Sequence, residues 1–155
     1  MNLKELKKSR KKIVEGDIFA LLLPNNTYLF GRVISTIASI GPMENCNLIY
    51  IYRDVSDDIK NVPELTPENL LVAPIMTNNL PWRKGYFEVV QSKALNISDK
   101  LKQHCFHCSF NGKFYDEYSN QLEKAVEPVG IWALHSYRTI DDEISTALGI
   151  PLSED

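Results

Sequence analysis

The sequence predicts a β-rich α+β fold, either a small SH3-like barrel or a partly open antiparallel sheet, with a C-terminal helix. Apolar, β-branched and aromatic runs of strand length recur along most of the chain, between clusters of turn-forming Pro, Asn and Gly. Only the last part changes to the 3–4 spacing of an amphipathic helix. There are no internal repeats or linkers, so we expect residues 1–155 to form one domain. It would have a basic arm or short helix over 1–12, mainly strands over 13–137 and the helix over 138–149.

The first two strands form a predicted hairpin. Residues 18–23 are apolar throughout, which is typical of a strand covered on both faces. The Pro-Asn-Asn sequence at 24–26 favours a turn, and an aromatic and β-branched run returns over 28–34. Gly31 interrupts this second strand, where we expect a bulge or a close backbone approach. Arg32 then points to the face opposite its neighbours in the strand.

The second strand is expected to continue to residue 40, and a third strand covers residues 46–53 with strict alternation. Its side chains divide between two faces, Leu48, Tyr50 and Tyr52 on one and Ile49 and Ile51 on the other. An acidic connector over 54–65 leads to Thr66, which should cap a single helical turn. A further strand is predicted over 70–76.

The next segments are a loop over 78–84, a strand over 86–91 and an irregular polar stretch over 92–103. A second hairpin is predicted over 105–118, because two aromatic-rich alternating runs flank Asn111-Gly112. Asn-Gly at such a position favours a type I′ turn.

The last two elements are a strand over 129–135 and a helix that Thr139 would cap. Apolar residues from Ile140 onward recur at helical spacing, acidic residues fill the first turn and Gly149 follows the end. These signals make this the only long helix that the sequence predicts.

The first hairpin also carries a familiar motif. Gly16-Asp17-Ile18-Phe19, an apolar strand, a Pro-Asn turn and Tyr28-Leu29-Phe30-Gly31-Arg32-Val33 resemble the immunity protein 26 family of bacteria. A second stretch that resembles this family is Leu80-Pro81-Trp82-Arg83-Lys84-Gly85-Tyr86-Phe87. The whole resemblance spans about residues 13–91. It implies that the residues shaping this motif are structural: Gly16, Asp17, Phe19, Gly31, Arg32 and Gly85.

The resemblance implies an immunity protein of a polymorphic toxin system, of the kind that operates in contact-dependent inhibition between bacteria. Such a protein binds a cognate toxin from its own or a sister cell and blocks it, by covering the active site or by binding an exosite. It implies no cofactor and no catalytic residue.

The charge of the chain is divided unevenly. Residues 1–12 hold six of the seventeen basic residues and one acid, so residues 13–155 carry a formal charge of −8. An acidic body disfavours nucleic acid and favours a basic protein partner through its long-range field, although it also serves plain solubility. The basic arm is either a solvated terminus or, if its charges cluster on a folded face, a nucleic-acid or membrane patch.

Partner contacts are expected among exposed acids of the connectors and among exposed aromatic residues, which commonly anchor interfaces. We predict this set: Asp54, Asp57, Asp58, Glu64, Trp82, Glu123 and Glu127.

The cluster His104-Cys105-Phe106-His107-Cys108 contains residue types that bind zinc. In a strand Cys105 and Cys108 would project to opposite faces, so we interpret both as small core residues and expect no metal site. His135 could approach these cysteines from elsewhere in the fold, as a Cys–His nucleophile would require. The sequence shows no phosphate loop, dinucleotide fingerprint or zinc-helix motif. We therefore expect no enzyme.

Three cysteines, an odd number, indicate reduced thiols. No apolar run reaches the roughly 20 residues of a membrane helix, and no apolar segment follows the basic N-terminus as in a secretory signal. We expect a cytoplasmic protein with no membrane partner. The alternative function is an SH3-like nucleic-acid-binding or regulatory module, in which exposed aromatics and Arg32 or Arg83 would stack on bases.

Overall fold

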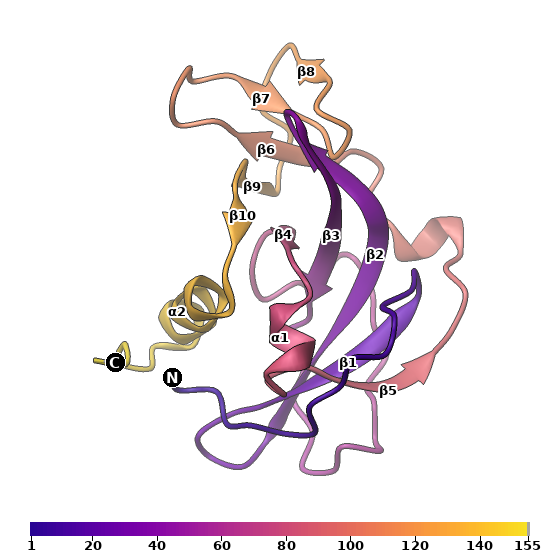
Figure 1. The fold of residues 1–155 in the computed structure, drawn as a ribbon, viewed down its shortest axis with the longest axis vertical. Helices are drawn as coiled ribbons and strands as arrows, with labels where there is room; N and C mark the ends of the chain where they lie inside the picture. Colours follow the sequence, from indigo (N-terminus) through magenta and orange to yellow (C-terminus); the bar gives the residue numbers. More distant parts are fainter. Residues whose placement is uncertain (155) are drawn as a thin grey trace.

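The computed structural model describes residues 1–154 and consists of two β-sheets, a C-terminal helix and short helical turns (Figure 1). The first sheet has the strand order β10-β4-β3-β2-β1-β5, and the second has the order β8-β7-β6-β9. The strands are β1 (Asp17–Leu22), β2 (Tyr28–Ile40), β3 (Met43–Ile51), β4 (Ile75–Thr77), β5 (Glu88–Ser92), β6 (Cys105–His107), β7 (Phe114–Tyr115), β8 (Gln121–Leu122), β9 (Val129–Ile131) and β10 (Leu134–His135). The helices are α1 (Leu80–Arg83), a 3-10 turn η1 (Ile97–Asp99) and α2 (Tyr137–Leu148).

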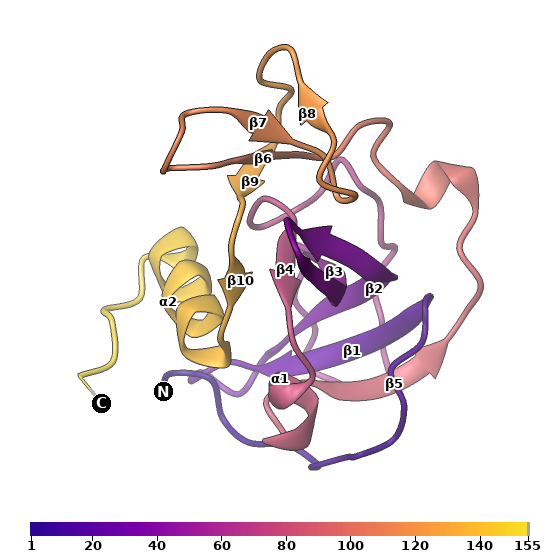
Figure 2. The same cartoon turned by 45° about the horizontal axis from the view of Figure 1, so that its top comes forward.

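The predicted β-rich α+β class with a C-terminal helix is confirmed. Within residues 1–154 the six-stranded sheet does not close on itself, so the partly open sheet describes the molecule and a closed SH3-like barrel does not. Most neighbouring strands are antiparallel, but β10 pairs with β4 and β9 pairs with β6 in parallel. Figure 1 shows β2 and β3 as long bent strands that reach from the first sheet toward the second. In the turned view of Figure 2 the second sheet lies above the first. Register shifts in their pairing accompany this bend.

The predicted first hairpin forms as expected. Strands β1 and β2 pair from Ile18 opposite Arg32 to Leu22 opposite Tyr28, and Asn26 adopts a positive φ of 66° in the turn. Gly31 lies where two segments approach closely, because a Cβ there would be 2.7 Å from the carbonyl oxygen of Tyr50 and would overlap the ring of Phe19. The sequence signal at this glycine therefore marks a close approach.

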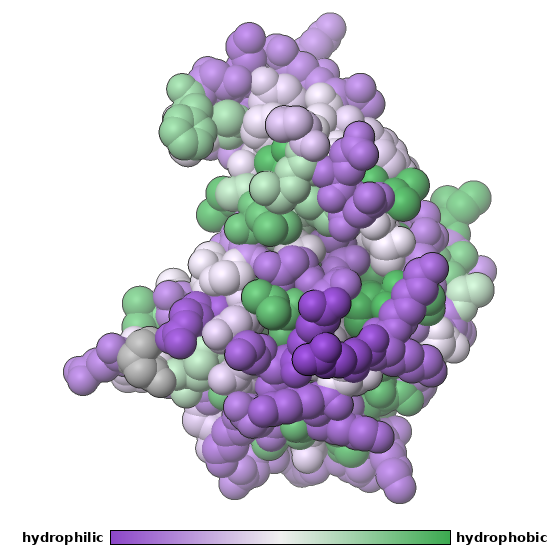
Figure 3. Space-filling model, in the orientation of Figure 1, coloured by the Kyte–Doolittle hydropathy of each residue, from purple (hydrophilic) through white to green (hydrophobic). Residues whose placement is uncertain are grey.

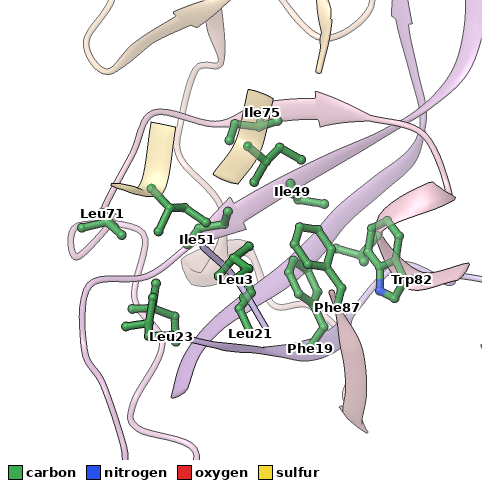
Figure 4. Close-up of a cluster of buried hydrophobic side chains, with 14 of the residues drawn as sticks. Leu3, Phe19, Leu21, Leu23, Ile49, Ile51, Leu71, Ile75, Trp82 and Phe87 are labelled. Carbon is green, nitrogen blue, oxygen red and sulfur yellow. The ribbon is translucent and has the colours of Figure 1, made fainter. Parts of the chain in front are cut away.

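Strand β3 separates two hydrophobic cores, as its alternation predicts. Ile49 and Ile51 face the first core, and Tyr50 and Tyr52 face the second. Figure 4 shows most of the first core, whose members come from both ends of the chain, from β1 to β4 and from α1 with the segment after it. They are Leu3, Ile13, Phe19, Leu21, Leu23, Leu29, Val33, Ile49, Ile51, Leu71, Ile75, Trp82, Phe87, Ile140 and Ile144. The second core lies against the second sheet and consists of Ile34, Ala38, Cys46, Leu48, Tyr50, Tyr52, Met76 and Phe106.

Residues 1–12 form no helix and are not a solvated terminus. Leu3 is buried, and the backbone N–H of Lys4 donates to the carbonyl of Leu22 at 2.9 Å. The N–H groups of Asn2 and Leu3 donate to the buried carboxylate of Asp141 in α2, at 3.1 and 2.7 Å. Burial of one leucine and hydrogen bonds to a charged acceptor thus fix the start of the chain against its last helix.

Helix α2 starts at Tyr137, one residue before the predicted boundary, but its N-cap lies three residues before the predicted cap. Ser136 is the N-cap, and its Oγ accepts a hydrogen bond from the N–H of Thr139 at 3.2 Å. Thr139 itself lies inside the helix, so the predicted cap is wrong. The apolar spacing starts only at Ile140 because the first turn lies toward solvent, which hides the true start in the sequence. Gly149 ends the helix with a φ of 70°, as predicted.

The segment between residues 66 and 84 differs most from expectation. Residues 66–69 form only a turn, and the strand predicted over 70–76 shrinks to β4, because Pro74 has no N–H to donate to a neighbouring strand. The predicted loop over 78–84 instead contains the helical turn α1, with a proline in its first turn.

The second predicted hairpin is also shorter than expected. Its strands are only β6 and β7, and a four-residue loop joins Cys108 to Lys113, whose backbones are hydrogen-bonded at 2.9 Å. A type I′ turn needs positive φ at both central residues, and of the pair Asn111-Gly112 only Gly112 has it, at 72°. The strand predicted over 129–135 divides into β9 and β10, which belong to different sheets.

Candidate interaction surfaces

The residues of the familiar motif hold turns and strands together. Gly16 has a φ of 95°, and the carboxylate of Asp17 accepts hydrogen bonds from the N–H of Val14 at 3.0 Å and the hydroxyl of Ser92 at 2.8 Å. The guanidinium of Arg32 is buried, donates to the carbonyl of Lys93 at 2.8 Å and lies 3.4 Å from the carboxylate of Asp99. Gly85 has a φ of 84°, and a Cβ there would lie 2.9 Å from the carbonyl oxygen of Leu6. Phe19 packs in the first core.

Trp82 is not an exposed anchor, so the prediction of its exposure is wrong. Its side chain is only 1% exposed and packs edge-on against Phe19 and Phe87, with ring centroids 5.3 and 5.0 Å away. Figure 4 shows these three rings side by side in the first core. The helical turn α1, which the sequence analysis took for a loop, places the indole against the sheet.

The acids predicted as partner contacts are all exposed, and they lie in two groups. Asp54, Asp57, Asp58 and Glu64 follow β3, where the N–H of Tyr28 and the carbonyl of Ser56 form a 2.8 Å hydrogen bond that holds the connector beside β2. These residues belong to the acidic connector over 54–65, which holds four acids and one base, Lys60.

Glu123 and Glu127 lie between β8 and β9 of the second sheet, apart in the fold from the acidic connector. No hydrogen bond, bridge or strand pairing within residues 1–154 joins the two acidic groups. The predicted contact acids therefore lie in two separate segments of the chain.

The His-Cys cluster lies beside the second core, to which it contributes Phe106. The imidazole of His104 lies between the hydroxyl of Tyr50, 2.6 Å from Nε2, and the carboxylate of Glu117 at Nδ1. Cys105 is buried, and its sulfur accepts a hydrogen bond from the N–H of Val126 at 3.4 Å. Cys108 is buried as well, and residues 1–154 contain no group of three or more His, Cys, Asp or Glu that could hold a metal ion. His104 thus ties the segment after η1 to β3 and to the second sheet.

Burial raises the pKa of the Tyr50 phenol to about 12, although the N–H of Leu101, which donates to this oxygen at 2.9 Å, opposes the shift. The pKa of Tyr52 is raised by burial too. A raised pKa means that folding favours the neutral phenol. This contribution is complete below pH 10, the ordinary pKa, and is lost as the pH rises toward about 12.

The free energy of unfolding should therefore fall above pH 10, by up to about 1.4 kcal/mol per pH unit for each of these tyrosines. Urea unfolding followed at several alkaline pH values measures this slope. Tyr50→Phe should make the slope shallower, whatever its effect on stability at neutral pH. An unchanged slope in Tyr50→Phe would show that the phenol ionises alike in the folded and unfolded chain.

A surface that the sequence analysis missed lies beside the second sheet. Phe110, at the tip of the loop after β6, is 99% exposed, and Ile131 and Leu134 of β9 and β10 are partly exposed. Figure 3 shows the outline of the molecule hollowed between the second sheet and α2, with hydrophobic side chains gathered over β9 and β10. The sequence assigned Phe110 and Ile131 to alternating strands, so nothing in the pattern distinguished them from core residues.

None of the helices within residues 1–154 has both the length and the apolar composition to cross a bilayer.

Comparison with known proteins gives one match. Residues 14–116 match the family model described as Immunity protein 26. The matched region runs from the start of β1 to the end of β7 and leaves the N-terminal arm, β8 to β10 and α2 outside. No curated protein and no solved structure matches the chain.

Proposed function

Because the chain belongs to the immunity protein 26 family, we propose that it binds and neutralises a cognate bacterial toxin made by its own or a sister cell. The observation that carries the proposal is the family match over residues 14–116, which include the whole first hairpin. The toxin would belong to a polymorphic system and act in contact-dependent inhibition. One domain would act by binding rather than catalysis, either covering the toxin's active site or occupying an exosite that excludes its substrate.

We propose further that the toxin is basic and that the acidic connector attracts it. The side chains of Asp54, Asp57, Asp58 and Glu64 are exposed, and none forms an ion pair within residues 1–154. Their field therefore extends into solvent and raises the rate at which a basic surface meets this side of the molecule. Glu123 and Glu127 would act at a second point of contact if the toxin reaches the second sheet.

The proposed capture predicts a kinetic effect. Asp57→Asn with Asp58→Asn should lower the association rate constant for the toxin about two- to tenfold and change the dissociation rate less, because rim charges act mainly on the encounter. Surface plasmon resonance with the immobilised toxin, repeated as salt shortens the Debye length below roughly 10 Å, measures both constants.

A matched control removes two exposed acids elsewhere, Glu44→Gln with Asp142→Asn. An equal fall in both double variants would mean that net charge alone matters and would remove the connector from the contact. The toxin for this test is the product of the gene directly beside that of this chain. Failure of the chain to restore growth to cells that express that toxin would defeat the immunity function itself.

The cytoplasm is the compartment we propose, with no membrane or nucleic-acid partner. The three cysteines are buried and unpaired, which suits a reducing compartment. Purification from the source cell tests the alternative function, since recovery of nucleic acid with no protein partner would favour an SH3-like nucleic-acid-binding module.

A further inference from the structure

We infer that the N-terminal arm and α1 together form a second recognition surface, which binds an acidic segment of a protein partner. We call this surface the basic face and define it by its exposed cations: Lys7, Lys8, Arg10, Lys11, Lys12, Arg83 and Lys84. It goes beyond the proposed toxin capture, because the acidic connector and the basic face attract groups of opposite charge. It also combines α1, inside the family match, with an arm that lies outside it.

Backbone hydrogen bonds hold the two halves of the basic face together. The N–H of Ser9 donates to the carbonyl of Trp82 at 3.1 Å, and the N–H of Leu6 donates to the carbonyl of Gly85 at 2.7 Å. Trp82 is buried in the first core, so the arm is hydrogen-bonded to a residue of the core. The cations of the arm are therefore held together on one folded surface. The sequence alone could not show whether they cluster in this way.

The surface between these cations is hollowed. One hollow, of about 410 Å³, is lined by Arg10, Lys11, Lys12 and Arg83 together with the polar side chains of Ser9, Asn45, Asn47 and Asn79. A neighbouring hollow, of about 550 Å³, is lined by Lys8, Arg10, Arg83 and Lys84. Arg10 and Arg83 line both hollows, so each hollow has two arginine side chains in its lining.

The charges of the basic face are not neutralised by the chain itself. None of the seven cations forms an ion pair with a carboxylate within residues 1–154. The nearby acid Glu88 accepts a hydrogen bond from the backbone N–H of Lys7 at 3.0 Å, and it pairs with no lysine or arginine side chain. Like charges held this close repel one another, and a bound anion relieves that repulsion.

The neighbours of these cations favour a protein over a nucleic acid. The exposed apolar residues that line these two hollows, Ile37 and Leu80, are aliphatic. The one aromatic residue there, Trp82, is buried, so the face offers no exposed ring on which a base could stack. Carboxylates interspersed with apolar side chains fit this surface best.

The test uses the full chain and three probes: a fluorescein-labelled peptide of alternating Glu and Leu, a labelled single-stranded oligonucleotide and inorganic phosphate. Fluorescence anisotropy should show that the peptide binds and that its affinity falls as salt rises. Lys11→Glu with Lys12→Glu should weaken peptide binding by about tenfold or more. Arg83→Gln with Lys84→Gln, on the other half of the basic face, should weaken it in the same direction.

The matched control is Lys60→Glu with Lys113→Glu, which reverses two exposed lysines outside the basic face. An equal loss in this control, tighter binding of the oligonucleotide, full competition by inorganic phosphate or no binding of the peptide would each overturn the inference. Circular dichroism of each variant confirms that the fold is kept. None of these outcomes bears on toxin binding through the acidic connector, which the Asp57 and Asp58 variants measure separately.

Discussion

Replacing Trp82 with alanine is expected to lower the free energy of unfolding by about 3–5 kcal/mol, the usual cost of removing a buried tryptophan side chain. The side chain is 1% exposed and contacts Phe19 and Phe87 edge-on, so its removal leaves a cavity between α1 and the first sheet. The backbone carbonyl of Trp82 also accepts a hydrogen bond from the N–H of Ser9. The N-terminal arm should therefore loosen together with the core.

Chemical denaturation monitored by circular dichroism measures this loss. Phe110→Ala is the matched control, because that aromatic side chain is 99% exposed and its removal should change stability by less than about 0.5 kcal/mol. If Trp82→Ala kept full stability and lost only toxin affinity, Trp82 would be a contact residue, as the sequence predicted. That result would contradict a stabilising role for this side chain in the first core.

The second large effect is expected at Asp141, which lies in α2 and is 1% exposed. Its two carboxylate oxygens accept the N–H groups of Asn2 and Leu3, so Asp141→Ala leaves two donors without an acceptor and frees the arm. We expect a loss of about 2–3 kcal/mol, because each lost bond has a charged partner and Leu3 is then exposed. Hydrogen exchange should become fast at the amides of residues 2–9.

Asp142→Ala is the control, since the next residue along α2 is exposed and accepts no hydrogen bond from the arm. Trypsin gives a second measurement, because a freed arm presents Lys7 to Lys12 for cleavage. Slow exchange at residues 2–9 in Asp141→Ala would mean that Leu3 and the bonds to Leu22, Trp82 and Gly85 hold the arm without the carboxylate.

The local signals in the sequence were enough to predict the first hairpin, the alternation of β3 and the C-terminal helix. In each case the deciding signals are local in the sequence: the Pro-Asn-Asn turn at 24–26 for the hairpin, and Gly149 with its positive φ at the end of the helix. What the sequence could not show is which distant segments meet. Residues 129–135 read as one strand, yet they divide between two sheets because β9 pairs with β6 and β10 with β4.

The candidate surfaces were predictable only as far as exposure follows from composition. The acids of the connector are exposed because a charged, proline-containing segment cannot be buried without partners. The prediction that Trp82 is exposed was wrong because α1 has only four residues. Four residues are too few to show helical periodicity in the sequence, so this segment was predicted to be a loop. Whether the basic arm packs on the fold was left open for a different reason. Its docking depends on Asp141, more than 130 residues away, and no local pattern in either segment indicates the other.

The attachment of the arm to α2 has a consequence for synthesis on the ribosome. Residues 2 and 3 leave the ribosome long before Asp141 is made, so their N–H groups have no native acceptor during most of translation. Residues 2 and 3 are therefore expected to be fixed late, only once α2 has been made. Nascent chains stalled before residue 141 should show rapid hydrogen exchange at residues 2 and 3, whereas chains that include α2 should protect them.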